Sequence, residues 1–134
     1  MSDGPATDRE VKMFEQLDAQ PGTIALRLGE TLTKADIEQI YVLVTAAFET
    51  HPRLNYFVDT TAYRGSALDA RIEDLKGHLT HLGWLSRFDR VALVTDNGLF
   101  RVAAGLFDMM TPVMQVKAFS PVETAAALRW CESG

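Results

Sequence analysis

Three side chains that can bind a metal ion follow one another at helical spacing near the middle of the chain. Asp74, His78 and His81 stand at positions i, i+4 and i+7, so on a helix they lie along one flank. A carboxylate and two imidazoles are suitable ligands for a divalent metal. The neighbouring sequence offers neither a fourth ligand nor a general base. We therefore interpret the three residues as a solvated flank, with a metal site as the alternative.

A second group of candidate residues carries hydroxyls. The apolar run "LNYFVD" ends in Asp59, Thr60 and Thr61 follow at once, and Ser66 precedes a helical pattern. The carboxyl end of a strand before a helix N-terminus is where α/β proteins bind ligands and anions, so these hydroxyls are candidate phosphorylation sites. The competing interpretation, which we favour, is structural. Ser66 then caps the helix, and the two threonines form hydrogen bonds to the local backbone.

The sequence lacks the motifs of common enzyme classes. It contains no G-x-S-x-G turn, no Walker loop and no G-x-G-x-x-G. The lone cysteine, Cys131, stands near the C-terminus without the electropositive surroundings that activate a thiol. The sequence therefore predicts a protein that is not an enzyme and needs no cofactor.

The most informative stretch is "NGLFRVAAGLFDMM", residues 97–110, which is apolar over about half of a helical circumference. The expected core stripe consists of Leu99, Val102, Ala103, Leu106 and Met110. Four further apolar residues widen it: Phe100, Ala104, Phe107 and Met109. Excess apolar surface of this kind is covered by a second subunit, a ligand or a membrane. A helix buried more deeply than average is the structural alternative.

The polar side of this helix decides among the possible partners. It holds Arg101 and Asp108, whose charges oppose each other, so a nonpolar small molecule or a homodimer through 97–110 is favoured over electrostatic docking on a membrane surface. The candidate ligand contacts are Phe100, Ala103, Leu106, Phe107, Met110 and, at the end of the preceding helix, Trp84.

Alternating strand and helix patterns must position these residues. Strands are expected over 11–17, 23–29, 54–59, 90–96 and 113–119, and helices from Thr33 to Pro52 and over 66–85, 97–110 and 120–130. The turn signal "AQPG" joins the first two strands into a hairpin. Strands that then alternate with helices predict an α/β domain, with a mixed, mostly parallel sheet of about five strands and about four helices.

Two of the expected helices carry start signals. Thr33 with Asp36 three residues later is a form of the capping box, and Ser120 with Glu123 is a second one. Pro121 stands at the first helical position, where proline is favoured.

Composition limits the class of protein. The 134 residues suit one domain, with a polar, disordered tail over 1–10 followed by a single domain over 11–134. A net charge of −5 without a basic block makes nucleic acid an unsuitable partner. A lone cysteine fits a reducing cytoplasm. No apolar run has the length of a membrane span or of a signal-peptide core.

Three phrases carry a resemblance to a known family. "TIALRLGETLTKADIEQI", "LNYFVDTTAYRGSALDARIEDLKGHL" and "FDRVALVTDNGLFRVAAGLF", in this order of elements, resemble the SpoIIAA-like proteins over about residues 11–132. These are small bacterial single-domain proteins with a STAS-type fold, akin in topology to Sec14 lipid-binding domains. The resemblance implies a mixed sheet with helices packed on it and no enzymatic role. It further implies binding of a nonpolar, lipid-like ligand or peripheral association with a membrane.

The resemblance also implies an alternative function. In regulatory STAS proteins, a serine in an Asp-Ser-Ser-Gly turn is phosphorylated and controls a protein partner, as in anti-sigma-factor antagonists. Here Asp59 matches the aspartate, and Thr60 and Thr61 stand where the two serines would be. The glycine does not follow directly, because "AYR" intervenes before Gly65. The predicted switch would consist of Asp59, the two threonines and Ser66.

Overall fold

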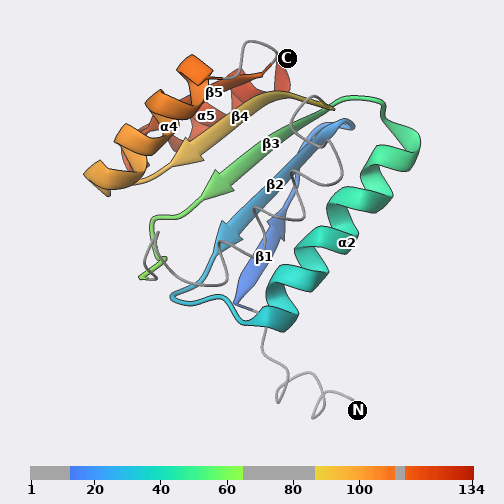
Figure 1. Ribbon diagram of the computed structural model, residues 1–134, viewed down its shortest axis with the longest axis horizontal. Coiled ribbons are helices and arrows are strands. Elements are labelled where there is room, and N and C mark those ends of the chain that lie inside the picture. Colours follow the sequence, from blue (N-terminus) through green and yellow to red (C-terminus); the bar gives the residue numbers. More distant parts are fainter. Residues whose placement is uncertain (1–12, 65–86, 111–113) are drawn as a thin grey trace.

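The structure is a computed structural model that describes residues 13–64, 87–110 and 114–134 (Figure 1). Eight helices and strands follow one another within these ranges: β1 (Phe14–Leu17), β2 (Thr23–Leu28), α2 (Lys34–Thr50), β3 (Leu54–Asp59), β4 (Phe88–Val94), α4 (Gly98–Met110), β5 (Gln115–Phe119) and α5 (Thr124–Glu132). A short 3-10 helix over Pro121–Glu123 precedes α5. The predicted tail over 1–10 and the predicted helix over 66–85 lie outside the described residues.

One five-stranded sheet runs through the domain in the order β1-β2-β3-β4-β5. The β1 and β2 strands pair antiparallel, and each later strand pairs parallel with its predecessor. This arrangement confirms the predicted α/β class with a mixed, mostly parallel sheet. It also places the carboxyl ends of β2 to β5 at one edge, where ligands bind in such folds.

The predicted hairpin is closed by a tight turn from Gln20 to Thr23. Thr23 N donates to Gln20 O at 3.0 Å, and Gly22 between them has φ of 88°. Pro21 precedes this glycine, as is typical of a type II turn. The proline and glycine thus fix the connection from β1 to β2.

Helix α2 starts where the sequence predicts. Thr33 Oγ1 accepts a hydrogen bond from Asp36 N at 3.1 Å, and Asp36 Oδ2 accepts one from Thr33 N at 2.9 Å. This reciprocal pair is a complete capping box. The helix then packs Ile40, Val44 and Phe48 onto one face of the sheet.

The sheet is covered on both faces, as the continuous apolar run in 54–59 predicts. On the α2 face, β3 contributes Leu54, Tyr56 and Val58 to the larger core cluster. On the opposite face, Phe57 packs with Ala127 and Cys131 of α5. Figure 1 shows α5 behind the strands, with α2 in front of them.

Several predicted boundaries shift in the structure, most clearly those of β4 and α5. The β4 strand spans Phe88–Val94 instead of 90–96, because Phe88 already pairs with Leu54 and its ring lies 5.7 Å from that of Tyr56. The α5 helix begins at Thr124, because Pro121–Glu123 form a 3-10 turn. The Ser120 capping box is present, with Glu123 Oε1 accepting from Ser120 N at 2.9 Å.

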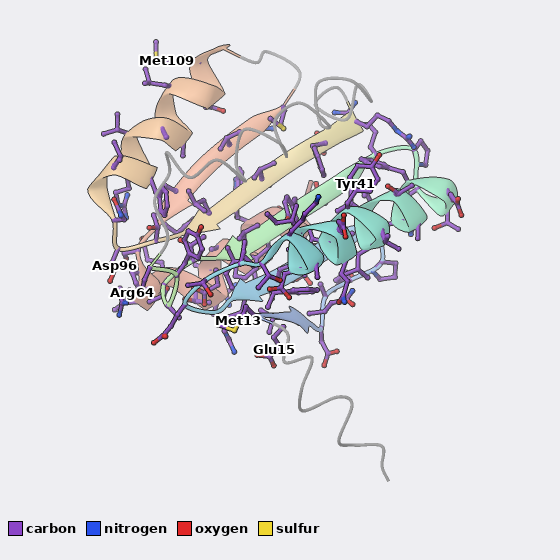
Figure 2. The ribbon with its side chains drawn as sticks, turned by 60° about the horizontal axis from the view of Figure 1, so that its bottom comes forward. Met13, Glu15, Tyr41, Arg64, Asp96 and Met109 are labelled. Atoms are coloured by element: carbon purple, nitrogen blue, oxygen red, sulfur yellow. The ribbon has the colours of Figure 1, made fainter. Side chains whose placement is uncertain are left out.

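The prediction that Leu99, Val102 and Leu106 form a buried stripe of α4 is wrong. Ala104 is buried, whereas Leu99, Val102 and Leu106 are more than half exposed. The helix is held at this rotation by Asp108, whose Oδ1 accepts a hydrogen bond from Val116 N of β5 at 2.8 Å. Since β5 is the last strand of the described sheet, the sheet covers only a small part of the surface of α4. The apolar face with Leu99, Val102 and Leu106 therefore points outward. Figure 2 shows the side chain of Met109 pointing away from the sheet.

None of the helices described in the structure has the length and apolar character to cross a membrane.

Candidate functional site

An apolar cavity of about 280 Å³ lies between the first half of α2, the sheet and the start of α4. Its lining residues are Leu28, Leu32, Ile37, Ile40, Tyr56, Val58, Thr60, Tyr63, Leu93 and Phe100. The strands β2, β3 and β4 each turn alternate side chains to this face, so the floor of the cavity is apolar. The volume is near the lower end of the range typical of small-molecule pockets.

Two aromatic rings close one side of the cavity. Tyr63 belongs to the loop after β3, and Phe100 belongs to the first turn of α4. Their ring centroids lie 6.4 Å apart at an interplanar angle of 24°. An offset stack of this kind contributes about 0.5–1.5 kcal/mol beyond the area that it buries. The rings thus connect the loop after β3 with α4.

Local hydrogen bonds hold both rings in place. Asn97 Oδ1 accepts hydrogen bonds from Leu99 N at 2.8 Å and from Phe100 N at 3.4 Å, so Asn97 caps α4. Tyr63 N donates to Thr60 O at 3.0 Å, and Thr60 N donates to Val94 O at 2.8 Å. The wall of the cavity is therefore tied to the ends of β3 and β4.

The cavity offers little polar chemistry. No residue of its described lining carries a charge. The Thr60 hydroxyl is buried and donates to Val94 O at 2.9 Å. A charged ligand group among these side chains would lack an ionic partner at a large free-energy cost.

Tyr56 adds a polar group to this lining. Its ring stacks on that of Phe88 at 5.7 Å, but its hydroxyl has no hydrogen-bond partner among the described residues. Burial raises the pKa of the phenol far above its ordinary value, so the hydroxyl stays protonated at neutral pH.

The predicted ligand contacts are divided in the structure. Phe100 lines the cavity, whereas Ala103 and Leu106 lie on the exposed face of α4. The side chains of Phe107 and Met110 and the whole of Trp84 lie outside the described part of the chain. Of the three predicted contacts whose side chains the structure describes, Phe100 alone lines the cavity.

The other lining residues were not singled out from the sequence as ligand contacts. Ile37 and Ile40 fall on the apolar stripe of α2, and Val58 falls in an apolar strand, where a core position is the usual interpretation. Tyr56, whose hydroxyl is polar, lies in the same apolar strand. Hydrophobic periodicity does not distinguish a residue that lines a cavity from a residue of the core.

The Asp-Thr-Thr turn lies at the carboxyl edge of the parallel strands. Asp59 Oδ1 accepts hydrogen bonds from Thr61 N at 2.9 Å and from Thr61 Oγ1 at 2.6 Å. Its Oδ2 lies 3.5 Å from Arg27 Nε. Thr60 is buried and Thr61 is half-buried, so Thr61 is the more accessible of the two hydroxyls. Figure 2 shows Arg64 and Asp96 at the same edge, and Ser66 lies outside the described residues.

The candidate metal ligands Asp74, His78 and His81 also lie outside the described residues. Within the described ranges, no group of three or more His, Cys, Asp or Glu side chains is arranged to hold a metal ion.

Comparisons with known proteins agree with this geometry. A scan against protein families matches residues 23–132 to the family described as SpoIIAA-like. A search of curated proteins finds no match. Among solved structures, the chain is similar to an uncharacterised protein of the DUF3478 family from Shewanella loihica PV-4, which has a SpoIIAA-like fold. The two chains are 27% identical with a TM-score of 0.64, over 88% of this chain and 91% of the other. The chain therefore belongs to the SpoIIAA-like family.

Proposed function

We propose that this chain is a non-enzymatic binding module that holds a nonpolar small molecule between α2 and α4. The observation that carries the proposal is the cavity of about 280 Å³, whose described lining residues are uncharged. Burying apolar ligand surface contributes about 25 cal/mol per Å² of area removed from water. No group of side chains in the described lining forms a nucleophile with a base, so binding is the activity that this site supports.

The first test combines ligand identification with a variant that fills the cavity. Protein purified without denaturant is extracted with organic solvent, and the extract is analysed by mass spectrometry. Val58→Phe fills part of the cavity with side-chain volume, so we expect it to abolish binding of an uncharged, apolar fluorescent probe. Val42→Phe is the matched control, because Val42 is 63% exposed on α2 and its replacement leaves the cavity unchanged. No extracted ligand together with no probe binding by the wild type would contradict the proposal.

A second candidate function, a protein-interaction module, rests on α4. Leu99, Val102, Leu106 and Met109 are exposed along one face of this helix. Their spacing of three, four and three residues is that of the a and d positions of a coiled-coil seam. The flanking Ala103 and Gly105 are small, so a partner helix can approach closely.

This seam supports self-association as the form of the second candidate. Two copies of α4 that pair antiparallel bring Leu99 of one helix to Met109 of the other, and Val102 to Leu106. Arg101 and Asp108 leave the helix without net charge, so its charges supply little attraction to an anionic membrane surface. Phosphorylation at Thr61 is the corresponding switch, because its hydroxyl is more accessible than that of Thr60.

A further inference from the structure

The cavity also specifies the chemical class of its ligand, an inference that rests on the proposed binding function. We propose that the ligand is a neutral molecule of about ten non-hydrogen atoms, with a single hydrogen-bonding head group that meets the Tyr56 hydroxyl. The volume of the cavity, its uncharged described lining and the unpartnered Tyr56 hydroxyl each contribute one part of this description.

The volume sets the size. An engineered protein cavity of about 150 Å³ accommodates benzene, which has six non-hydrogen atoms. At this ratio a cavity of about 280 Å³ takes about eleven such atoms. A medium-length alkyl chain or a substituted aromatic ring fits this space, whereas a full-length phospholipid with two acyl chains exceeds it.

The lining sets the charge. Among the described residues that line the cavity, none is Lys, Arg, His, Asp or Glu. A carboxylate or phosphate enclosed there would lose its hydration without gaining an ionic partner. The head group that enters the cavity is therefore uncharged, as in an alcohol, a ketone or a phenol.

The Tyr56 hydroxyl favours a ligand with one hydrogen-bonding head group. It makes no hydrogen bond within the described part of the chain. Tyr56 lines the cavity, and we assign the polar head group of the ligand to its hydroxyl. Burial holds the pKa of the phenol well above its ordinary range, which leaves it a neutral donor and acceptor.

Thr60 and Tyr63 are the other hydroxyl-bearing residues of the described lining, and the Tyr63 ring already stacks on that of Phe100. Thr60 Oγ1 already donates to Val94 O at 2.9 Å. A ligand head at Tyr56 would satisfy a hydroxyl that otherwise lacks a partner, whereas a head at Thr60 would have to displace an existing bond. A buried hydroxyl without a partner is unfavourable, which favours a ligand that can form a hydrogen bond with Tyr56.

The test uses three probes of similar size on the full chain at pH 8, with affinities from titration calorimetry. Butylbenzene measures occupancy of the cavity without a polar head, 1-nonanol adds a neutral head, and nonanoate adds a charged one. We expect 1-nonanol to bind at least about tenfold more tightly than nonanoate, because the charged head loses its hydration. Tyr56→Phe should weaken 1-nonanol about 2- to 12-fold, the loss of one hydrogen bond, and leave butylbenzene unchanged.

The outcomes separate the two proposals. Unchanged butylbenzene affinity shows that Tyr56→Phe is folded with its cavity intact, and Tyr41→Phe is the matched control because Tyr41 is outside the lining. If no probe binds to the wild type, the proposed function and this inference both fail. If butylbenzene binds but nonanoate binds as tightly as 1-nonanol, or Tyr56→Phe has no effect on 1-nonanol, the inference alone is overturned.

Discussion

Cys131 lies on the inner face of α5 with no exposed surface. Its thiol donates weakly to Arg90 O, with Sγ at 3.8 Å from that oxygen. Burial raises the pKa of the thiol to about 12. The residue therefore acts as a small core side chain, which agrees with the prediction that it is not a catalytic nucleophile.

This thiol gives the protein a pH dependence in alkaline solution. Between about pH 9 and pH 12, the unfolded chain has lost the thiol proton while the folded chain keeps it. The free energy of unfolding therefore falls as pH rises through this window, by up to about 1.4 kcal/mol per pH unit. Below about pH 8 the thiol contributes little to this slope, because it is protonated in both states.

Urea unfolding at pH 7, 8, 9 and 10 measures the effect. We expect wild type to lose about 1.4 kcal/mol more than Cys131→Ala between pH 8 and pH 10. The variant is less stable at pH 7, because it leaves a small void in the core, but titration of all other groups is common to both proteins. Equal slopes for the two proteins would show that the thiol is not protected.

Among the elements, helix α2 ends in an unusual way. Its last turn carries no basic residue, and its free carbonyl groups are satisfied from a distant segment. Arg87 Nη2 donates to Phe48 O at 2.9 Å, and its Nε donates to Pro52 O at 3.1 Å. The guanidinium carbon lies 4.1 Å from the centre of the Phe48 ring. Arg87 thus joins the start of β4 to the end of α2.

Arg87→Ala should lower the free energy of unfolding by about 1.5–3 kcal/mol, because it removes charge-assisted hydrogen bonds and a cation–π contact. Arg64→Ala is the matched control, since Arg64 is exposed and should change stability by less than about 0.5 kcal/mol. Urea unfolding at pH 7 gives both values. If Arg87→Ala lowers the free energy of unfolding no more than Arg64→Ala does, Arg87 does not stabilise the end of α2.

Helix α4 shows how an edge strand limits burial. Ala104 and Asp108 attach the helix to the sheet. A methyl group added at Gly105 would meet no atom within 4 Å, so this part of the helix surface is open. The face with Leu99, Val102, Leu106 and Met109 therefore remains outside and is available to a partner.

For the whole molecule, the exposed seam predicts a concentration-dependent dimer. Sedimentation velocity of wild type should show a dimer, and Leu106→Glu should yield a monomer because it places charges in the seam. Val122→Glu is the matched control, as Val122 is 95% exposed outside α4. Thr61→Glu tests the phosphorylation alternative, which predicts a changed association. A monomeric wild type at all concentrations would contradict the dimer.

Much of the fold follows from local sequence patterns. The capping box at Thr33, the Pro-Gly turn and the apolar run of 54–59 each act over a few residues, and all are present in the structure. Each depends on backbone groups close in sequence, so the pattern alone determines the local conformation. The order of strands and helices then determined the mixed sheet.

Only the tertiary structure decided which apolar residues remain uncovered. The pattern of α4 predicted a buried stripe at Leu99, Val102 and Leu106, but the hydrogen bond from Val116 N to Asp108 turns that stripe outward. The cavity likewise depends on β2, β3, β4, α2 and α4 meeting in space. Periodicity shows which side chains are apolar. Whether they are buried depends on neighbours that are far away in the sequence.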